Sequence, residues 1–161
     1  MIINSIKNNL SIVLAKENDW SKIQELNNFV FLNDAPHDSD IDLNWPFSKK
    51  GVTYYKKLAA GSYGVCYLAK IKELVVGYIA LAEKDFGYRH SLYLEIENIG
   101  VHPEYRSKGI GQLLINQATK CAKVKKIKKL YVAAYWKNKK AISFYKRNGF
   151  SEIGLELERI L

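Results

Sequence analysis

The chain has 161 residues, of which 48% are hydrophobic and 25% are charged, and its formal net charge is +9. This length and composition are ordinary for a soluble globular domain, and we expect residues 1–161 to form a single domain that needs no disulfide or metal staple. No segment approaches the ~18 uninterrupted apolar residues of a membrane span, whereas the positive charge favours anionic partners such as a phosphorylated cofactor.

In the first sixty residues, the spacing of apolar side chains predicts one strand followed by helices. The predicted elements are a strand over 11–15, a helix over 19–31, a polar loop or broken helix over 33–50, and a short helix over 51–60. Pro36 and Pro46 interrupt the polar segment, and this is why we do not predict a continuous helix there.

Three runs rich in β-forming residues come next. The runs over 63–69 and 74–82 are separated by a tight polar connection, which predicts an antiparallel hairpin. A third strand is predicted over 91–101. Side chains alternate along a strand, so we expect one side of it to carry Tyr93, Glu95, Glu97, Ile99 and Val101.

The last third of the chain alternates helix and strand. We predict a helix over 108–123, a strand over 130–134, a helix over 138–148 with Gly149 as its C-cap, and a last strand over 150–157. The complete order therefore predicts a mixed α/β sheet.

The two cysteines, Cys66 and Cys121, lie far apart within apolar stretches, without a CxxC motif or a histidine at ligand spacing. This pattern predicts two buried free thiols and argues against a structural disulfide or a metal site. Residues 1–14 lack a full apolar region and a small-residue cleavage site, so we expect no signal peptide and a cytoplasmic location.

The most informative stretch is the strand end, turn and helix start at residues 101–111. Gly109 and Gly111 stand at the start of the predicted helix, where backbone N–H groups are unpaired and the helix dipole is positive. Together with Arg106 and Lys108 they favour a pyrophosphate site. The alternative is a tight turn with close packing of helix on sheet. Neither a P-loop nor a dinucleotide fingerprint is present.

These residues resemble a known family. Arg106-x-x-Gly109-x-Gly111, following Val101-x-Pro103, resembles the acyl-CoA loop of the GNAT N-acetyltransferase superfamily. The family's second signature is similar to Asn138-x-x-Ala141-Ile142-x-Phe144-Tyr145-x-x-x-Gly149-Phe150. The resemblance implies a mixed, mostly antiparallel sheet of six to seven strands flanked by about four helices, with a splayed strand pair that holds acyl-CoA.

The resemblance also implies a cofactor site for acetyl-CoA, without a metal. The pyrophosphate would lie on the backbone N–H groups of Arg106, Ser107, Lys108, Gly109, Ile110 and Gly111, and the pantetheine arm beside Ile99, Gly100 and Val101. A bulge at Gly100 would open the slot, and an N–H near Val101 would polarise the thioester carbonyl. Asn138 corresponds to a side-chain contact with the cofactor; an N-cap is its alternative role.

Tyr145 corresponds to the family's general acid, which protonates the leaving CoA thiolate; the alternative is a core aromatic beside Phe144. The base is Glu97 or Glu95 by the same resemblance, with Glu97 preferred and a water as a relay. Either carboxylate has a second interpretation as a partner in a cross-strand pair on the surface.

The implied activity is transfer of an acetyl group to a primary amine by direct attack in a ternary complex. A small-molecule acceptor, such as a polyamine, an aminoglycoside or an amino-acid-like amine, suits the local acidity from Asp34, Asp38, Asp40 and Asp42. Ala133 stands where ribosomal-protein and N-terminal acetyltransferases often carry Glu, which weakens that assignment.

Two alternative functions stay open at this point: a protein N-acetyltransferase acting on an N-terminus or Lys side chain, and a non-catalytic acyl-CoA-binding module. A nucleic-acid binder would need basic residues and exposed aromatics in one groove, and the sequence offers only Lys runs. Members of the family often dimerise, so a homodimer is a further expectation.

Overall fold

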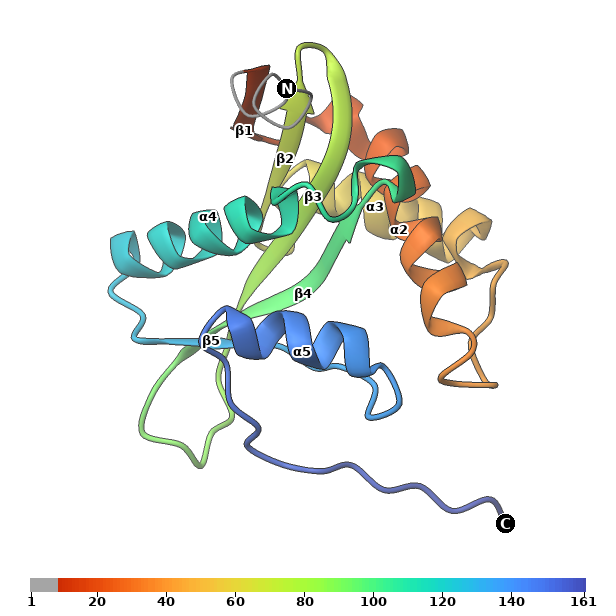
Figure 1. Ribbon diagram of the computed structural model, residues 1–161, viewed down its shortest axis with the longest axis vertical. Coiled ribbons are helices and arrows are strands. Elements are labelled where there is room, and N and C mark those ends of the chain that lie inside the picture. Colours follow the sequence, from red (N-terminus) through yellow and green to blue (C-terminus); the bar gives the residue numbers. More distant parts are fainter. Residues whose placement is uncertain (1–8) are drawn as a thin grey trace.

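The computed structural model describes residues 9–161, and within them a five-stranded sheet forms the centre of the fold (Figure 1). The sheet order follows the chain: β1 (Leu10–Leu14), β2 (Val65–Ile71), β3 (Leu74–Lys84), β4 (Tyr93–Val101) and β5 (Lys129–Tyr131). The α-helices are α2 (Trp20–Asp34), α3 (Lys49–Ala59), α4 (Ile110–Val124) and α5 (Lys139–Arg147). This mixed architecture confirms the predicted fold class.

The two faces of the sheet bury separate cores. On one face α2 and α3 supply Ile23, Tyr55 and Leu58, which pack with Leu68 of β2 and Tyr78 of β3. On the other face α4 packs an apolar stripe against the strands, and the members of that stripe are Ile110, Leu114, Ile115, Ala118, Cys121 and Ala122. Each helix is therefore held by its apolar side, and the two faces can carry different binding sites.

The first four strands form antiparallel pairs, whereas β5 joins β4 in parallel. The parallel pairing is short, because it extends only from Tyr93↔Lys129 to Glu95↔Tyr131. Beyond Glu95 the remaining residues of β4 pair with β3 alone. The strands β4 and β5 thus separate, in agreement with the splayed pair that the family resemblance implies.

The irregularity in β4 lies at Glu97. Ala80 faces Asn98 and the next residue, Leu81, faces Ile96, so Glu97 is left without a partner in the ladder. The prediction of a bulge at Gly100 is therefore wrong, because Gly100 is in register with Tyr78. Glycine is required at position 100 for another reason, the close packing around it: a Cβ there would lie 2.7 Å from the ring of Tyr78 and 3.1 Å from Val30.

The extra residue also changes which side chains share a face. Ile99 and Val101 pack with the core on the α4 side. Asn98 instead bonds to Asn27 of α2 on the opposite side. The expectation that Glu97 shares a face with Ile99 and Val101 is therefore wrong, because a bulge shifts the alternation by one residue.

The predicted last strand over 150–157 is not formed, and residues 151–161 have no regular structure in the part of the chain described. The described sheet consequently has fewer strands than the six to seven expected. Cys66 and Cys121 are buried free thiols, as predicted. Among residues 9–161 no helix combines the length and the apolar character needed to cross a bilayer. Most of the segment interpreted as lacking a signal peptide, residues 1–8, lies outside the described residues.

Candidate active site

The loop between β4 and α4 is held in shape by its own side chains. After Val101, a 3-10 turn runs over Pro103–Tyr105. Arg106 Nε donates a hydrogen bond of 3.0 Å to the carbonyl of Val101, and Lys108 Nζ donates one of 2.6 Å to the carbonyl of Glu104. Both cationic side chains therefore brace the loop and concentrate positive charge at the N-terminus of α4, where an anion is stabilised.

The two glycines of this loop have different structural roles. Gly109 is the N-cap of α4 with φ of 84°, and a Cβ there would meet no atom within 4 Å, so the backbone is open to a ligand. Ser107 also has a positive φ, 60°. Gly111 instead allows α4 to approach α5, because its Cβ would lie 3.0 Å from Cζ of Phe144. Close packing, the alternative considered for the Gly pair, is thus found at Gly111, whereas the pyrophosphate site at Gly109 stays a prediction.

Asn138 joins two helices of the site, α5 and α2. Its Oδ1 accepts a hydrogen bond of 3.0 Å from the backbone N–H of Ala141 and so caps α5. Its Nδ2 donates a hydrogen bond of 3.2 Å to Asp34 Oδ1 at the end of α2. The side chain is almost buried, with 8% exposed. The N-cap role is therefore present, and the amide group also ties α5 to α2.

Tyr145 lies on α5 and packs between two aromatic rings, those of Phe144 and Phe150. Burial first, and then the negative charge of Asp34, raise the pKa of the Tyr145 hydroxyl to about 12. A phenol with such a pKa keeps its proton at neutral pH. Tyr145 can therefore act as a proton donor, and the charge of Asp34 favours the protonated form of its hydroxyl.

The two candidate bases, Glu95 and Glu97, have different surroundings. Glu95 forms an ion pair of 2.9 Å with Lys84. Glu97 has no such partner among the described residues. Neighbouring protein atoms exclude part of the water around the Glu97 carboxyl group, and this desolvation raises its pKa. The negative charge of Glu95 raises the pKa further, whereas the positive charge of Lys84 lowers it. Of the two, Glu97 has the surroundings that suit a proton acceptor working near neutral pH.

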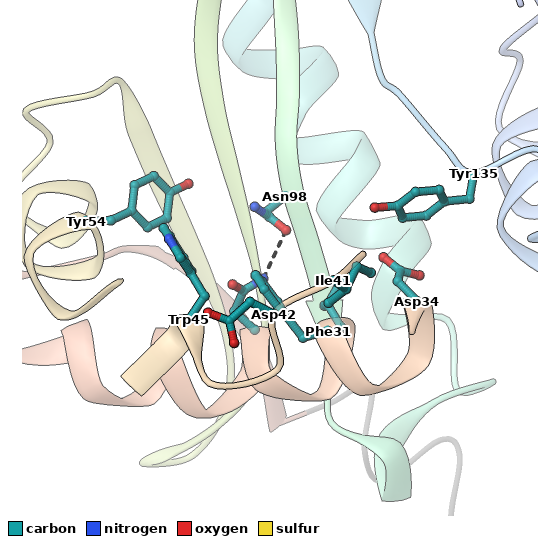
Figure 2. A pocket seen from close by; sticks show the side chains of 10 residues that line it. Phe31, Asp34, Ile41, Asp42, Trp45, Tyr54, Asn98 and Tyr135 are labelled. Atoms are coloured by element: carbon teal, nitrogen blue, oxygen red, sulfur yellow. Dashed lines mark hydrogen bonds between the residues drawn. The ribbon is translucent and has the colours of Figure 1, made fainter. Parts of the chain in front are cut away.

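A pocket of about 500 Å³ lies on the α2–α3 face of the sheet (Figure 2). Trp45 and Tyr54 stand at one end, while Asp34 and Tyr135 stand at the other. The complete lining consists of Asn27, Val30, Phe31, Asp34, Ile41, Asp42, Trp45, Tyr54, Asn98 and Tyr135. Because Asn98 belongs to β4 and Tyr135 follows β5, the pocket reaches the gap between the splayed strands.

A buried hydrogen-bond network fixes the inner wall of this pocket. Asn27 Nδ2 donates to the hydroxyl of Tyr78 at 2.7 Å and to Oδ1 of Asn98 at 3.0 Å. The hydroxyl of Tyr55 donates to Asn27 Oδ1. Asn98 is thereby held next to Glu97, at the bulge. The pattern of apolar residues does not reveal this network, although a polar Asn27 within the apolar stripe of a helix is a signal that could have pointed to it.

The electrostatics of the pocket are acidic at both ends. Asp34 and Asp42 contribute carboxylates to the lining, and the charge of Glu97 acts on the neighbouring Tyr54, whose pKa rises to about 12 mainly through burial. Aromatic faces and carboxylates together bind ammonium groups, through cation–π contact and charge pairing.

Comparison with known proteins agrees with this geometry. A family model described as the acetyltransferase (GNAT) family matches residues 20–150, which is most of the chain. The chain belongs to the GNAT acetyltransferase family. The match includes the β4–α4 loop and α5, so the loop, the splayed strands and Tyr145 all lie within the shared domain.

A curated relative, the uncharacterized N-acetyltransferase MJ1207 of Methanocaldococcus jannaschii, is 48% identical over 60 residues, covering 36% of this chain and 26% of that protein. The chain spans less than a third of the length of the curated relatives it matches. Among solved structures, a tetramutant of the BH1408 protein from Bacillus halodurans has a TM-score of 0.81 at 18% identity, covering 94% of this chain and 99% of that one.

Aminoglycoside N-acetyltransferase AAC(6')-Iy, solved in complex with CoA, has a TM-score of 0.73 at 14% identity, with 94% of each chain covered. At these identities the two solved structures share the fold of this chain, and the family assignment comes from the family model.

Proposed function

We propose that this protein transfers an acetyl group from acetyl-CoA to a primary amine of a small molecule, by direct attack of the amine within a ternary complex. The observation that carries this proposal is that two sites meet where β4 and β5 separate. The N-terminus of α4 and its loop lie on one face of the sheet, and an acidic, aromatic pocket on the other face reaches the same gap. The family and the CoA complex of a structural neighbour support it.

The residues around the α4 N-terminus fit acetyl-CoA. A bulky pyrophosphate needs unpaired backbone N–H groups and an approach free of side chains, and Gly109 provides both. Arg106 and Lys108 add positive charge. In this proposal the backbone of Ile99, Gly100 and Val101 guides the pantetheine arm along the unpaired edge of β4, while Ser107, Ile110 and Gly111 complete the N–H cradle. Acetyl-CoA supplies an acetyl group activated as a thioester.

In the proposed reaction, Glu97 accepts the proton of the acceptor ammonium, directly or through a water, so that the amine nitrogen regains its lone pair. Its raised pKa suits that step. The new C–N bond forms and the C–S bond breaks, and Tyr145 gives its proton to the leaving thiolate; the second proton that the nitrogen loses as it becomes an amide then restores the Tyr145 hydroxyl, directly or through a water. Asn138 holds the start of α5 and so positions Tyr145 relative to Asp34.

The pocket favours a cationic acceptor of modest size. Its volume of about 500 Å³ is within the usual range for small-molecule sites. Asp34 and Asp42 would attract ammonium groups, and Trp45 would stack against an apolar or sugar face. Two structural neighbours are named as aminoglycoside acetyltransferases, which supports an acceptor with several amines.

A thiol-release assay tests the proposal. Acetyl-CoA is supplied with polyamines, aminoglycosides, amino acids or short peptides, and the wild-type chain is compared with Tyr145→Phe. We expect turnover with one class of small cationic amine. In Tyr145→Phe we expect kcat to fall by about a hundredfold or more, with acetyl-CoA binding unchanged in calorimetry.

The other outcomes lead to different functions. Thiol release with peptides alone would assign a protein N-acetyltransferase. Binding of acetyl-CoA without CoA release by any amine would favour a non-catalytic acyl-CoA-binding module or an acceptor outside the panel. Unchanged turnover in Tyr145→Phe would remove that residue from the mechanism and leave the transferase proposal intact.

A further inference from the structure

The carboxylate of Asp34 lies where the pocket meets the helix that carries the proposed general acid. Asp34 is the last residue of α2 and lines the pocket at the end where Tyr135 stands (Figure 2). Its Oδ1 accepts a hydrogen bond of 3.2 Å from Asn33 Nδ2 and another of 3.2 Å from Asn138 Nδ2. Two amide groups therefore hold one carboxylate oxygen in place, and the second of them fixes the carboxylate relative to α5.

The other oxygen of this carboxylate is available to a ligand. Within residues 9–161, Asp34 forms no ion pair and its Oδ2 accepts no hydrogen bond. The Nζ of Lys139, at the start of α5, instead lies 3.6 Å from the centre of the Trp136 ring. A carboxylate that lines a pocket without a cationic partner attracts a cation from the ligand.

The same carboxylate lies at the end of α5 toward which the side chain of Tyr145 leans. Asn138 and Tyr145 are seven residues apart, which is about two helical turns, so they lie on the same side of α5. Helical side chains tilt toward the N-terminus of their helix, and this directs the Tyr145 side chain back toward Asn138 and Asp34. The electrostatics agree with this geometry, because the charge of Asp34 contributes, after burial, to the raised pKa of Tyr145.

Other charged groups around Tyr145 are bonded elsewhere or exposed. Arg106 and Lys108 of the β4–α4 loop donate hydrogen bonds to backbone carbonyls. The charged residues of β5 and α5 are exposed to solvent, and they are Lys129, Lys139, Lys140, Lys146 and Arg147. Asp34 is therefore the charged side chain through which an acceptor in the pocket can act on Tyr145.

We propose that Asp34 is a positioning residue of the acetyl transfer, which binds a second, non-reacting cation of the acceptor and thereby lets Tyr145 give up its proton more readily. This inference rests on the proposed function. The charge of Asp34 alone holds the proton on Tyr145, because deprotonation would bring two negative charges together. A cation bound to Asp34 cancels that effect, so the O–H bond of Tyr145 breaks more easily as the S–H bond of CoA forms. Asp34 itself neither gains nor loses a proton.

The proposed role predicts which acceptors react fastest. Agmatine and pentylamine both offer a primary amine on an unbranched chain, but agmatine alone has a guanidinium tail that stays charged at alkaline pH. With saturating acetyl-CoA and wild-type protein, we expect agmatine to have the lower KM. At saturating acceptor its single-turnover rate should be about threefold higher than that of pentylamine. A contact that only bound the acceptor would change KM and leave this rate alone.

Asp34→Asn removes the charge and keeps an amide oxygen that can accept the hydrogen bond from Asn138. It should raise KM for agmatine by about fivefold. The rate with pentylamine should rise about threefold, to that of agmatine, because the charge that holds the proton on Tyr145 is gone. Tyr145→Phe, which has no proton to give, should also react equally fast with both amines.

Asp42→Asn is the matched control, because it removes a carboxylate from the other end of the same pocket. The backbone carbonyl of Asp42 accepts the N–H of Trp45 at 3.0 Å, which places this residue away from α5. The control should raise KM for agmatine and keep the threefold ratio of single-turnover rates.

Two further measurements need no turnover. Calorimetry should show that agmatine binds about fivefold more weakly to Asp34→Asn than to the wild type. NMR of isotope-labelled tyrosine at alkaline pH, with the Tyr145 resonance identified from Tyr145→Phe, reports the pKa of that hydroxyl. It should lie below about 12 in Asp34→Asn, and agmatine should lower it in the wild type.

The failure of this role and the failure of the proposed function give different results. Equal binding of agmatine to the wild type and Asp34→Asn, or an unchanged pKa of Tyr145, would overturn the role of Asp34. A threefold rate ratio that survives in Asp34→Asn or in Tyr145→Phe would overturn it as well. If no amine releases CoA while calorimetry and NMR give the expected results, the proposed acetyl transfer is refuted, and the catalytic use of this contact with it.

Discussion

At the scale of single residues, the bulge in β4 determines how the site is arranged. Without it, the alternation set by Leu94 and Ile96, which pack on the α4 side, would place Asn98 on that side and turn Ile99 and Val101 toward α2. Because Glu97 has no partner in the ladder, the strand turns Asn98 toward Asn27 while Ile99 stays in the opposite core. Bulges commonly re-aim a side chain next to an active site, and here the re-aimed side chain is that of Asn98, the neighbour of the carboxyl group with the raised pKa.

This arrangement predicts how the reaction rate depends on pH. If Glu97 is the base, its carboxyl group must be ionised, so kcat/KM should fall as the pH drops through its raised pKa. Glu97→Gln should lower kcat by about 10²-fold to 10⁴-fold and remove the acidic limb of the profile. Steady-state kinetics from acidic to alkaline pH measures both effects.

Glu95→Gln is the matched control, because it changes the neighbouring carboxylate in the same way. The negative charge of Glu95 raises the pKa of Glu97, so its removal should shift the acidic limb to lower pH while kcat stays nearly constant. A large loss of kcat in Glu95→Gln, with Glu97→Gln still active, would make Glu95 the base.

At the scale of secondary-structure elements, the close approach of α4 and α5 places the start of α4 beside Phe144 and the proposed general acid, Tyr145. Gly111 stands in the first turn of α4, and its missing side chain leaves room for the ring of Phe144 on α5. Tyr145 is the next residue along α5. The position of Tyr145 therefore depends on a helix contact that tolerates little added volume.

Gly111→Val should disturb both stability and catalysis. The added Cβ would lie 3.0 Å from the Phe144 ring, so α5 must shift or the ring must turn. Overpacking of this kind costs about 1–3 kcal/mol, and thermal unfolding should report it. We also expect kcat to fall, because Tyr145 moves with the helix.

Two further variants show whether the helix contact is the cause. Gly154→Val adds the same side chain where no atom lies within 4 Å, and its stability should stay near that of the wild type. Phe144→Leu in the Gly111→Val background should restore part of the lost stability, since it makes room at the same contact. Equal losses in the single and double variants would show that the two residues are not coupled.

The elements that were predictable from the sequence depend on local signals, whereas those that were not depend on contacts between distant residues. The helices at 110–124 and 139–147 were predictable because their apolar spacing, Gly109 and the Asn138 cap are local signals. The bulge at Glu97 was not, because it depends on the register between β4 and β3. The unformed strand after residue 150 has a good strand pattern in the sequence. Whether this strand forms depends on the presence of a sheet edge to pair with it, and the local sequence carries no information about that edge.

The pocket on the α2–α3 face, the proposed acceptor site, shows the same limit. Its lining comes from α2, the segment 41–45, α3, β4 and the residue Tyr135. The acidity of Asp34 and Asp42 was visible in the sequence, but their position beside Tyr54 and Tyr135 follows from the packing of four separate segments. The charge pattern thus indicated acidic residues that do line the pocket, while the shape of the pocket required the fold.

At the scale of the whole molecule, the sheet separates the two proposed binding sites. The α4 helix and its loop pack on one face, and the pocket is built largely from the α2–α3 face. The two sites meet only where β4 and β5 part. A substitution within one site should therefore leave binding at the other unchanged, provided that it lies away from the splay.

Asp42→Asn and Gly109→Ala test this separation as a pair. Asp42→Asn removes a charge from the pocket and keeps an oxygen that can accept the N–H of Asn44, now bonded at 2.9 Å. It should raise KM for a cationic acceptor by about fivefold, as expected for loss of an exposed charge pair, with the Kd of acetyl-CoA unchanged.

Gly109→Ala strains a backbone with φ of 84°, although its Cβ has open space. It should weaken acetyl-CoA binding by about tenfold, with the acceptor KM nearly constant. If either substitution changes both constants alike, the sites are coupled through the sheet and the separation is refuted.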